Sequence, residues 1–328
     1  MTPPQPANPS AARTPPCRPE VTRLAPSPTG ALHLGNARTF LANWLLARQR
    51  GWRIVLRIED LGGPAIKPWA AAAAIDILQW LGPDWDEGPL TQAADLTPYT
   101  RAMEHLAEAG LAYPCSLSRQ EILAAASAPQ EGSQEVRYPP ELRPAPGPAR
   151  FESAGANWRF RTPDGQVAIE DGFAGSLQLR PLETIGDFVI WTKRGEPAYQ
   201  LAVVVDDARQ GVTQVVRGDD LLDSAGRQAL LQRALGLPAP TWTHLPLVLG
   251  DDGRRLAKRH GDTRLDRYRE AGVPVERVLG LLGWWLGAVE TRRPCPLAEV
   301  ATGFELGGVP AGPVRFTPED DAWLLGGG

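Results

Sequence analysis

The feature that most constrains the fold is a strand–helix–strand pattern near the start of the chain. Residues 21–25 are predicted to form a short buried strand, and residues 35–50 place apolar side chains close to helical spacing. Residues 53–59 then alternate and are rich in isoleucine and valine, which is typical of a strand. Strands that are joined through a helix pair in parallel, so the sequence predicts an α/β fold on a parallel sheet.

Further segments extend this pattern and indicate how the chain is organised. Helices are predicted at 68–81, 97–109, 222–235 and 275–286, buried strands at 198–206, 211–217 and 243–249, and short strands at 158–162 and 187–192. Prolines between residues 113 and 150 oppose regular structure there. We therefore expect a disordered tail over 1–18, a first half of the sheet over 19–112, an α+β insertion over 113–195, a second half over 196–260 and a short helical segment over 261–328.

Composition excludes several classes of function. No apolar segment approaches the ~20 residues of a membrane helix, and the first residues lack the apolar core of a signal peptide, so we expect a cytoplasmic protein with no membrane attachment. The cysteines, Cys17, Cys115 and Cys295, are too few and too scattered for a disulfide framework. The net charge of −4 does not favour general affinity for nucleic acid, so any RNA contact would use local patches.

The turn at residues 26–36 has the features of a phosphate-binding site. Gly30 and Gly35 permit close approach of the backbone, and the following helix should offer unpaired N–H groups at the positive end of its dipole. His33 lies where it could contact a phosphoryl oxygen. The alternative is an ordinary turn with an incidental histidine.

A second candidate is the basic segment at residues 254–260. Arg254, Arg255, Lys258 and Arg259 could close over a triphosphate and leave with pyrophosphate. The alternative is a solvated basic loop without a ligand.

The third candidate is a pocket for an acidic substrate. Arg23 and Arg217 both lie at predicted strand ends, and two guanidinium groups would suit a dicarboxylate. Glu59 could accept the ammonium group of the same substrate, and Tyr199 could provide a hydrogen bond. Alternatively, residues 57–60 form only a surface network of ion pairs, and composition alone does not rank the two interpretations.

Together these segments resemble a known family. Residues 23–36 look like the HIGH region of the class I aminoacyl-tRNA synthetases, in the glutamyl and glutaminyl form, and residues 255–259 look like their KMSKS loop. Similar segments follow in the family's order at 57–60, 186–188, 198–207, 210–213, 216–221 and 244–247. The resemblance implies a Rossmann-like parallel sheet, an inserted acceptor-type subdomain and a short C-terminal helical segment without an anticodon-binding domain.

Within the family, the chain is most similar to truncated paralogues of glutamyl-tRNA synthetase. Only residues 261–328 follow the basic loop, and Val203 stands where full-length enzymes tend to have Asn. This similarity implies that ATP, with Mg²⁺, and L-glutamate give glutamyl-adenylate without tRNA. The glutamyl group would then pass to queuosine in the anticodon of tRNA(Asp). We expect the protein to act as a monomer.

The resemblance also assigns roles to single residues. The glutamate-binding residues would be Arg23, Ala25, Ser27, Glu59, Tyr199 and Arg217. The ATP-binding residues would be His33, Gly35, Asn36, Lys258 and Arg259, of which His33 and Lys258 would be catalytic. The departures from the family motifs are Asn36 for the second His of HIGH, and Arg255 and Ala257 in the KMSKS-like loop.

The largest departure from the family concerns zinc. Relatives often bind zinc through Cys-x-Cys and Tyr-x3-Cys, and here Cys115 and Tyr138 remain while Leu117 and Leu142 occupy the other two positions. Leucine cannot bind zinc, which takes about four ligands. We therefore expect no structural zinc in this chain.

Three other functions stay open at this point. The first is a minimal glutamyl-tRNA synthetase that charges the 3′ end of a tRNA. The second is a non-catalytic RNA-binding paralogue, which the lost zinc ligands and Ala257 would allow. The third is a nucleotidyltransferase that makes a small-molecule adenylate.

Overall fold

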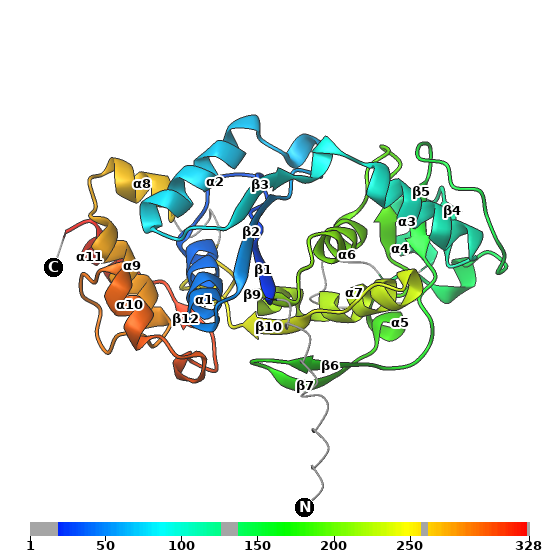
Figure 1. Cartoon of the computed structure of the whole chain (residues 1–328). Coiled ribbons are helices and arrows are strands. Elements are labelled where there is room, and N and C mark those ends of the chain that lie inside the picture. Colours follow the sequence, from blue (N-terminus) through cyan, green and yellow to red (C-terminus); the bar gives the residue numbers. More distant parts are fainter. Residues whose placement is uncertain (1–18, 126–136, 257–261, 327–328) are drawn as a thin grey trace, which may run out of the picture.

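The computed structural model describes residues 19–125, 137–256 and 262–326, and the predicted tail over 1–18 lies outside them. Figure 1 labels the elements. The strands are β1 (Val21–Leu24), β2 (Arg53–Ile58), β3 (Glu87–Thr91), β4 (Ala112–Cys115), β5 (Asn157–Phe160), β6 (Val167–Asp171), β7 (Gly175–Leu179), β8 (Val189–Trp191), β9 (Gln214–Gly218), β10 (Thr241–Leu245), β11 (Val248–Leu249) and β12 (Val314–Arg315). The α-helices are α1 (Leu34–Arg50), α2 (Pro68–Leu81), α3 (Thr97–Glu108), α4 (Arg119–Ala125), α5 (Pro181–Thr184), α6 (Tyr199–Arg209), α7 (Leu222–Leu235), α8 (Leu265–Glu270), α9 (Val275–Trp285), α10 (Leu297–Gly303) and α11 (Pro318–Leu324).

Parallel strands form the centre of the molecule, as the sequence predicts. β1 pairs in parallel with β2, and β2 pairs in parallel with β3. β9 and β10 form a second parallel pair, which lies beside β1. The two groups meet where the Thr213 N–H donates to the Val21 carbonyl over 2.9 Å. This α/β arrangement brings the carboxyl ends of β1 and β9 together, which is where ligands bind in such folds.

The segment at 198–206, predicted as a buried strand, instead belongs to helix α6. Its run of valines is buried on every side, because α6 packs among α3, α7 and β8. A helix without an exposed face shows no amphipathic spacing, so its apolar run cannot be distinguished from that of a buried strand. Tertiary packing here overrides the strand preference of valine.

The strand predicted over 243–249 is divided into β10 and β11. Pro246 lies at the break, and a proline has no N–H group to donate to a strand partner. β11 then pairs with β12 near the C-terminal end rather than continuing alongside β9.

Part of the segment predicted as an insertion extends the central sheet. β4, β5 and β8 form a separate antiparallel sheet. The hairpin of β6 and β7, however, joins β10 through a parallel pairing of Trp242 with Asp171. This hairpin therefore lies against the strand that neighbours β9.

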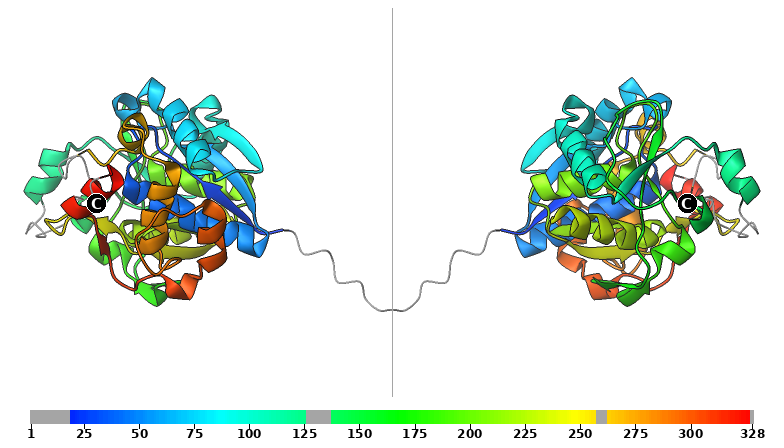
Figure 2. Two further views of the ribbon diagram at one scale, coloured as in Figure 1. Left: turned by 90° about the vertical axis from the view of Figure 1, so that its left-hand side faces the viewer. Right: turned by 90° about the vertical axis from the view of Figure 1, so that its right-hand side faces the viewer.

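The ends of the molecule carry different elements. Helices α8–α11 lie at one end and the sheet of β4, β5 and β8 at the other (Figure 1). Figure 2 shows these two ends face on. None of the described helices combines the length and the apolar character needed to cross a bilayer.

Candidate active site

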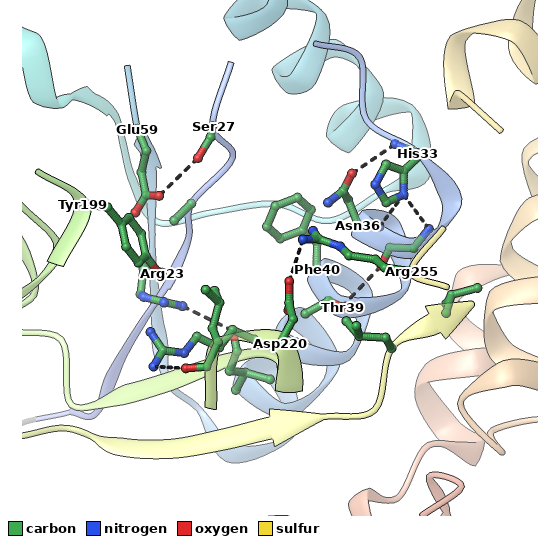
Figure 3. A pocket seen from close by; sticks show the side chains of 18 residues that line it. Arg23, Ser27, His33, Asn36, Thr39, Phe40, Glu59, Tyr199, Asp220 and Arg255 are labelled. Carbon is green, nitrogen blue, oxygen red and sulfur yellow. Dashed lines mark hydrogen bonds and ion pairs between the residues drawn. The ribbon is translucent and has the colours of Figure 1, made fainter. Parts of the chain in front are cut away.

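A cavity of about 330 Å³ opens at the carboxyl ends of β1 and β9 (Figure 3). Nine of the residues assigned from sequence line it: Arg23, Ala25, Ser27, His33, Gly35, Asn36, Glu59, Tyr199 and Arg217. Lys258 and Arg259 lie outside the described residues. The phosphate-binding turn and the candidate dicarboxylate pocket are therefore parts of one cavity, although they come from segments almost two hundred positions apart.

His33 caps the start of α1 with its own ring. Its Nδ1 accepts from the backbone N–H groups of Gly35 (3.1 Å) and Asn36 (3.3 Å), and the Asn36 Oδ1 accepts from the His33 backbone N–H (3.2 Å). We expected unpaired N–H groups at this helix start, and that expectation is wrong for these two, because the imidazole already satisfies them. A Cβ at Gly35 would lie 3.1 Å from the His33 imidazole. Glycine at this position therefore leaves room for the ring.

His33 is neutral in this environment, and the cap determines which ring nitrogen carries its proton. Burial, and then the charge of Arg255, lower its pKa from 6.5 to about 4, so the ring is neutral near pH 7. Because Nδ1 accepts hydrogen bonds, the remaining proton is on Nε2. The ring therefore offers an N–H donor that can face a ligand in the cavity.

Arg23 and Arg217 are both buried, each about 5% exposed. The Arg23 Nη1 donates to the Val216 carbonyl over 3.3 Å, and its Nε lies 3.7 Å from the Asp207 carboxylate. The Arg217 Nη1 donates to Gln228 over 2.9 Å. Burial lowers the pKa of Arg217 from its ordinary value, but a guanidinium remains protonated near pH 7. The cavity thus holds two buried cations.

Glu59 is held by a buried network rather than a surface one. Its Oε1 lies 3.2 Å from the Arg57 Nη2, and its Oε2 accepts from the Ser27 hydroxyl over 3.3 Å. Arg57 is fully buried and also binds Asp207 over 2.7 Å and Gln210 over 2.9 Å. Burial alone would lower the pKa of Arg57, but the two carboxylates raise it above its ordinary value. The ion pair considered from sequence exists, but it is buried and supports the cavity.

Tyr199 begins α6 and separates two cavities. It is 39% exposed as a whole. Burial of its hydroxyl raises its pKa above the ordinary value, the charge of Arg217 opposes this, and the charge of Glu59 adds to the increase. On its other side lies a second cavity of about 450 Å³, lined among others by Arg119, Arg159 and Arg227. One side chain thus borders both spaces.

The start of the basic loop reaches the first cavity. The Arg255 Nη1 lies 2.6 Å from the Asp220 carboxylate, and both residues line the cavity. Sequence analysis did not assign a role to Asp220 or to Phe40, which also line it. Asp220 lies in the family-like segment 216–221, so that segment was the available signal.

The four positions of the family's zinc site pack as a small apolar core. Cys115 and Tyr138 are buried, and Leu117 and Leu142 pack against them. The Cys115 Sγ lies 3.7 Å from the Tyr138 hydroxyl, which donates to the Leu142 carbonyl over 3.1 Å. Among the described residues, no cluster of three or more His, Cys, Asp and Glu side chains could hold a metal ion. These residues do not fit a zinc ion.

The fold and this cavity place the chain among the class I tRNA synthetases, and the sequence match agrees. Residues 20–306 match the family described as "tRNA synthetases class I (E and Q), catalytic domain". The chain belongs to this family, whose members use ATP.

Individual relatives carry more specific names than the family as a whole. The chain is 46% identical to the glutamyl-Q tRNA(Asp) synthetase of Symbiobacterium thermophilum, over 93% of this chain and 98% of that protein. It is 39% identical to glutamate–tRNA ligase 2 of Halorhodospira halophila, over 92% of this chain but 64% of that protein. The crystal structure of glutamate–tRNA synthetase from Elizabethkingia anophelis aligns with a TM-score of 0.76 at 25% identity, over 94% of this chain and 70% of that one.

Proposed function

We propose that this chain activates L-glutamate with ATP, without tRNA, and transfers the glutamyl group to queuosine in the anticodon of tRNA(Asp). The observation that carries the proposal is the single cavity in which Arg23, Arg217 and Glu59 face the same space as His33. The close match to the Symbiobacterium relative over nearly its whole length supports the choice of acceptor.

The buried charges match those of glutamate. Arg23 and Arg217 supply two guanidinium groups for its two carboxylates, and Glu59 supplies an anion for its ammonium group. The α-carboxylate oxygen then attacks the α-phosphorus of ATP. A carboxylate–phosphorus bond forms, the bond to the bridging oxygen breaks, and pyrophosphate leaves with that electron pair.

The remaining part of the cavity suits the phosphates. Neutral His33 directs its Nε2–H toward a phosphoryl oxygen, and Arg255 adds a positive charge beside it. Gly35 and Asn36 keep the ring in this orientation through the helix cap. In this proposal Lys258 and Arg259 complete the neutralisation of the triphosphate, and Mg²⁺ enters with ATP as part of the substrate.

The second cavity is the proposed place of the acceptor nucleoside. It shares Tyr199 with the glutamate pocket, and its arginines suit an anionic RNA backbone. A hydroxyl of queuosine placed there would attack the carbonyl carbon of glutamyl-adenylate and release AMP. We propose that the protein works as a monomer in the cytoplasm, where tRNA is found, and that no zinc takes part.

Two measurements test the proposal. Glutamate-dependent exchange of pyrophosphate into ATP should occur without RNA, and no exchange with any amino acid would contradict activation. Labelled glutamate, ATP and bulk tRNA with or without queuosine should then give label in the anticodon loop of queuosine-containing tRNA only. Label at the 3′-terminal adenosine would instead identify a minimal glutamyl-tRNA synthetase.

A further inference from the structure

A buried histidine binds Arg217 on the side away from the cavity. His244 lies on β10, directly opposite Arg217 on β9. The Arg217 Nε is 2.9 Å from the His244 Nε2, and His244 is only 1% exposed. His244 does not line the cavity, so it would act on a ligand only through Arg217.

The direction of this hydrogen bond fixes the tautomer of His244. A guanidinium only donates hydrogen bonds, so the His244 Nε2 must accept and its proton must lie on Nδ1. The Nδ1 is 2.6 Å from the Asp171 Oδ2, which accepts that proton in a hydrogen bond. Arg217, His244 and Asp171 thus form a chain in which each residue donates to the next.

The surroundings keep His244 neutral. Burial lowers its pKa and the charge of Arg217 lowers it further, while Asp171 and Asp219 act in the opposite direction, with a net decrease. An imidazolium would also present an N–H group to the N–H of Arg217. The hydrogen-bond chain is therefore consistent only with the neutral ring.

Asp171 is itself held in one orientation. Its Oδ1 accepts from the backbone N–H groups of Phe173 (2.9 Å), Ala174 (2.8 Å) and His244 (3.1 Å). These three donors require an acceptor at Oδ1, so the other oxygen must face the imidazole. The turn of the β6–β7 hairpin thereby sets which atom His244 meets.

We propose that Asp171 and His244 are positioning residues that hold the Arg217 guanidinium in the orientation that receives a glutamate carboxylate. The inference rests on the proposed function, because it takes glutamate as the ligand of Arg217. The Nε is bound to His244, Nη1 to Gln228 and Nη2 to the Leu221 carbonyl, so each terminal nitrogen carries one further N–H. Tyr199, which lines the cavity, also hydrogen-bonds to this guanidinium. His244 thus fixes the plane of the Arg217 guanidinium group. The orientation of this plane decides whether its N–H groups can hydrogen-bond to a carboxylate.

The sharpest test is Asp171→Asn. The three backbone donors keep the amide oxygen at the Oδ1 place, so the new amide NH₂ faces the His244 Nδ1 and forces the ring proton onto Nε2. The Nε2–H of His244 and the Nε–H of Arg217 then point at each other, and the hydrogen bond between the two residues is lost. In pyrophosphate exchange, KM for glutamate should rise about tenfold while KM for ATP stays unchanged. Glu170→Gln, an exposed carboxylate on the same hairpin, is the matched control and should change neither.

Substitutions of His244 test the same contact without altering the hairpin. His244→Asn keeps an amide near Asp171 but cannot reach Arg217, so KM for glutamate should rise as in Asp171→Asn. His244→Gln places an amide oxygen near the former Nε2 and should restore most of the affinity. The thermal transition of each variant shows whether it folds. If either the Asp171 variant or a His244 variant does not fold, KM for glutamate is compared in the variants that do.

Arg217→Lys separates this inference from the proposed function. If Arg217→Lys raises KM for glutamate but Asp171→Asn and His244→Asn do not, the positioning role is wrong and the pocket stands. If Arg217→Lys leaves KM for glutamate unchanged, the proposed pocket itself is wrong. Equal increases in KM for ATP and for glutamate in the Asp171 and His244 variants would also overturn the inference, because they would indicate general damage.

Discussion

Replacing the buried Arg57 of β2 with methionine should destabilise the protein far more than replacing an exposed arginine of the same strand. Arg57 is completely buried and binds two carboxylates, Asp207 at 2.7 Å and Glu59 at 3.2 Å. A charged hydrogen bond contributes about 1.5–3 kcal/mol, and removing one member of a buried ion pair costs about 3–5 kcal/mol. We therefore expect Arg57→Met to lower the free energy of unfolding by about 3–5 kcal/mol, because two buried carboxylates lose their shared partner.

The same strand provides a matched control. Arg53 pairs with Glu87 at 3.0 Å, but both side chains are 43% exposed. An exposed pair contributes about 0–1 kcal/mol, so Arg53→Met should have a small effect. Urea denaturation followed by tryptophan fluorescence gives both values by linear extrapolation. Losses of similar size in the two variants would refute the claim that the Arg57 network is a buried support of the cavity.

Three further predictions concern the helix cap and the apolar core at the zinc positions. The folded pKa of His33, about 4, is below its unfolded value of 6.5, so the unfolded chain binds a proton that the folded chain excludes and stability falls as pH drops through this window. His33→Asn, which keeps a capping acceptor, should lose less stability than the wild type between pH 7 and 4; an identical loss would contradict the lowered pKa. Gly35→Ala should change stability by less than about 1 kcal/mol, since better helix propensity offsets a strained cap, yet KM for ATP should rise severalfold because the imidazole is displaced. An unchanged KM for ATP would count against the role of the ring. Treatment with EDTA should leave the thermal midpoint unchanged, and a double variant with Leu117→Cys and Leu142→Cys should gain a response to zinc. A lower midpoint of the wild type in EDTA would show that metal does stabilise this chain.

Local patterns in the sequence determined much of the fold. The first strand, helix α1 and the next strand follow from apolar spacing within single segments, and α7 has the predicted bounds, Leu222–Leu235. Nine of the residues that line the cavity were assigned from sequence, because their motifs and charges are visible there, whereas Asp220 and Phe40 were missed. Such features need no knowledge of what packs against them.

Tertiary structure decided the rest, because it depends on neighbours that are distant in the chain. Helix α6 has the composition of a strand and becomes a helix only where other elements surround it. Whether the helix start offers free N–H groups depended on the position of the His33 ring. The hydrogen-bond chain joins residues 171, 217 and 244 from three strands, and no local spacing predicts that contact. Sequence periodicity predicts which side chains are buried. The partner of each buried charge, in contrast, is determined only when the strands have assembled into the sheet.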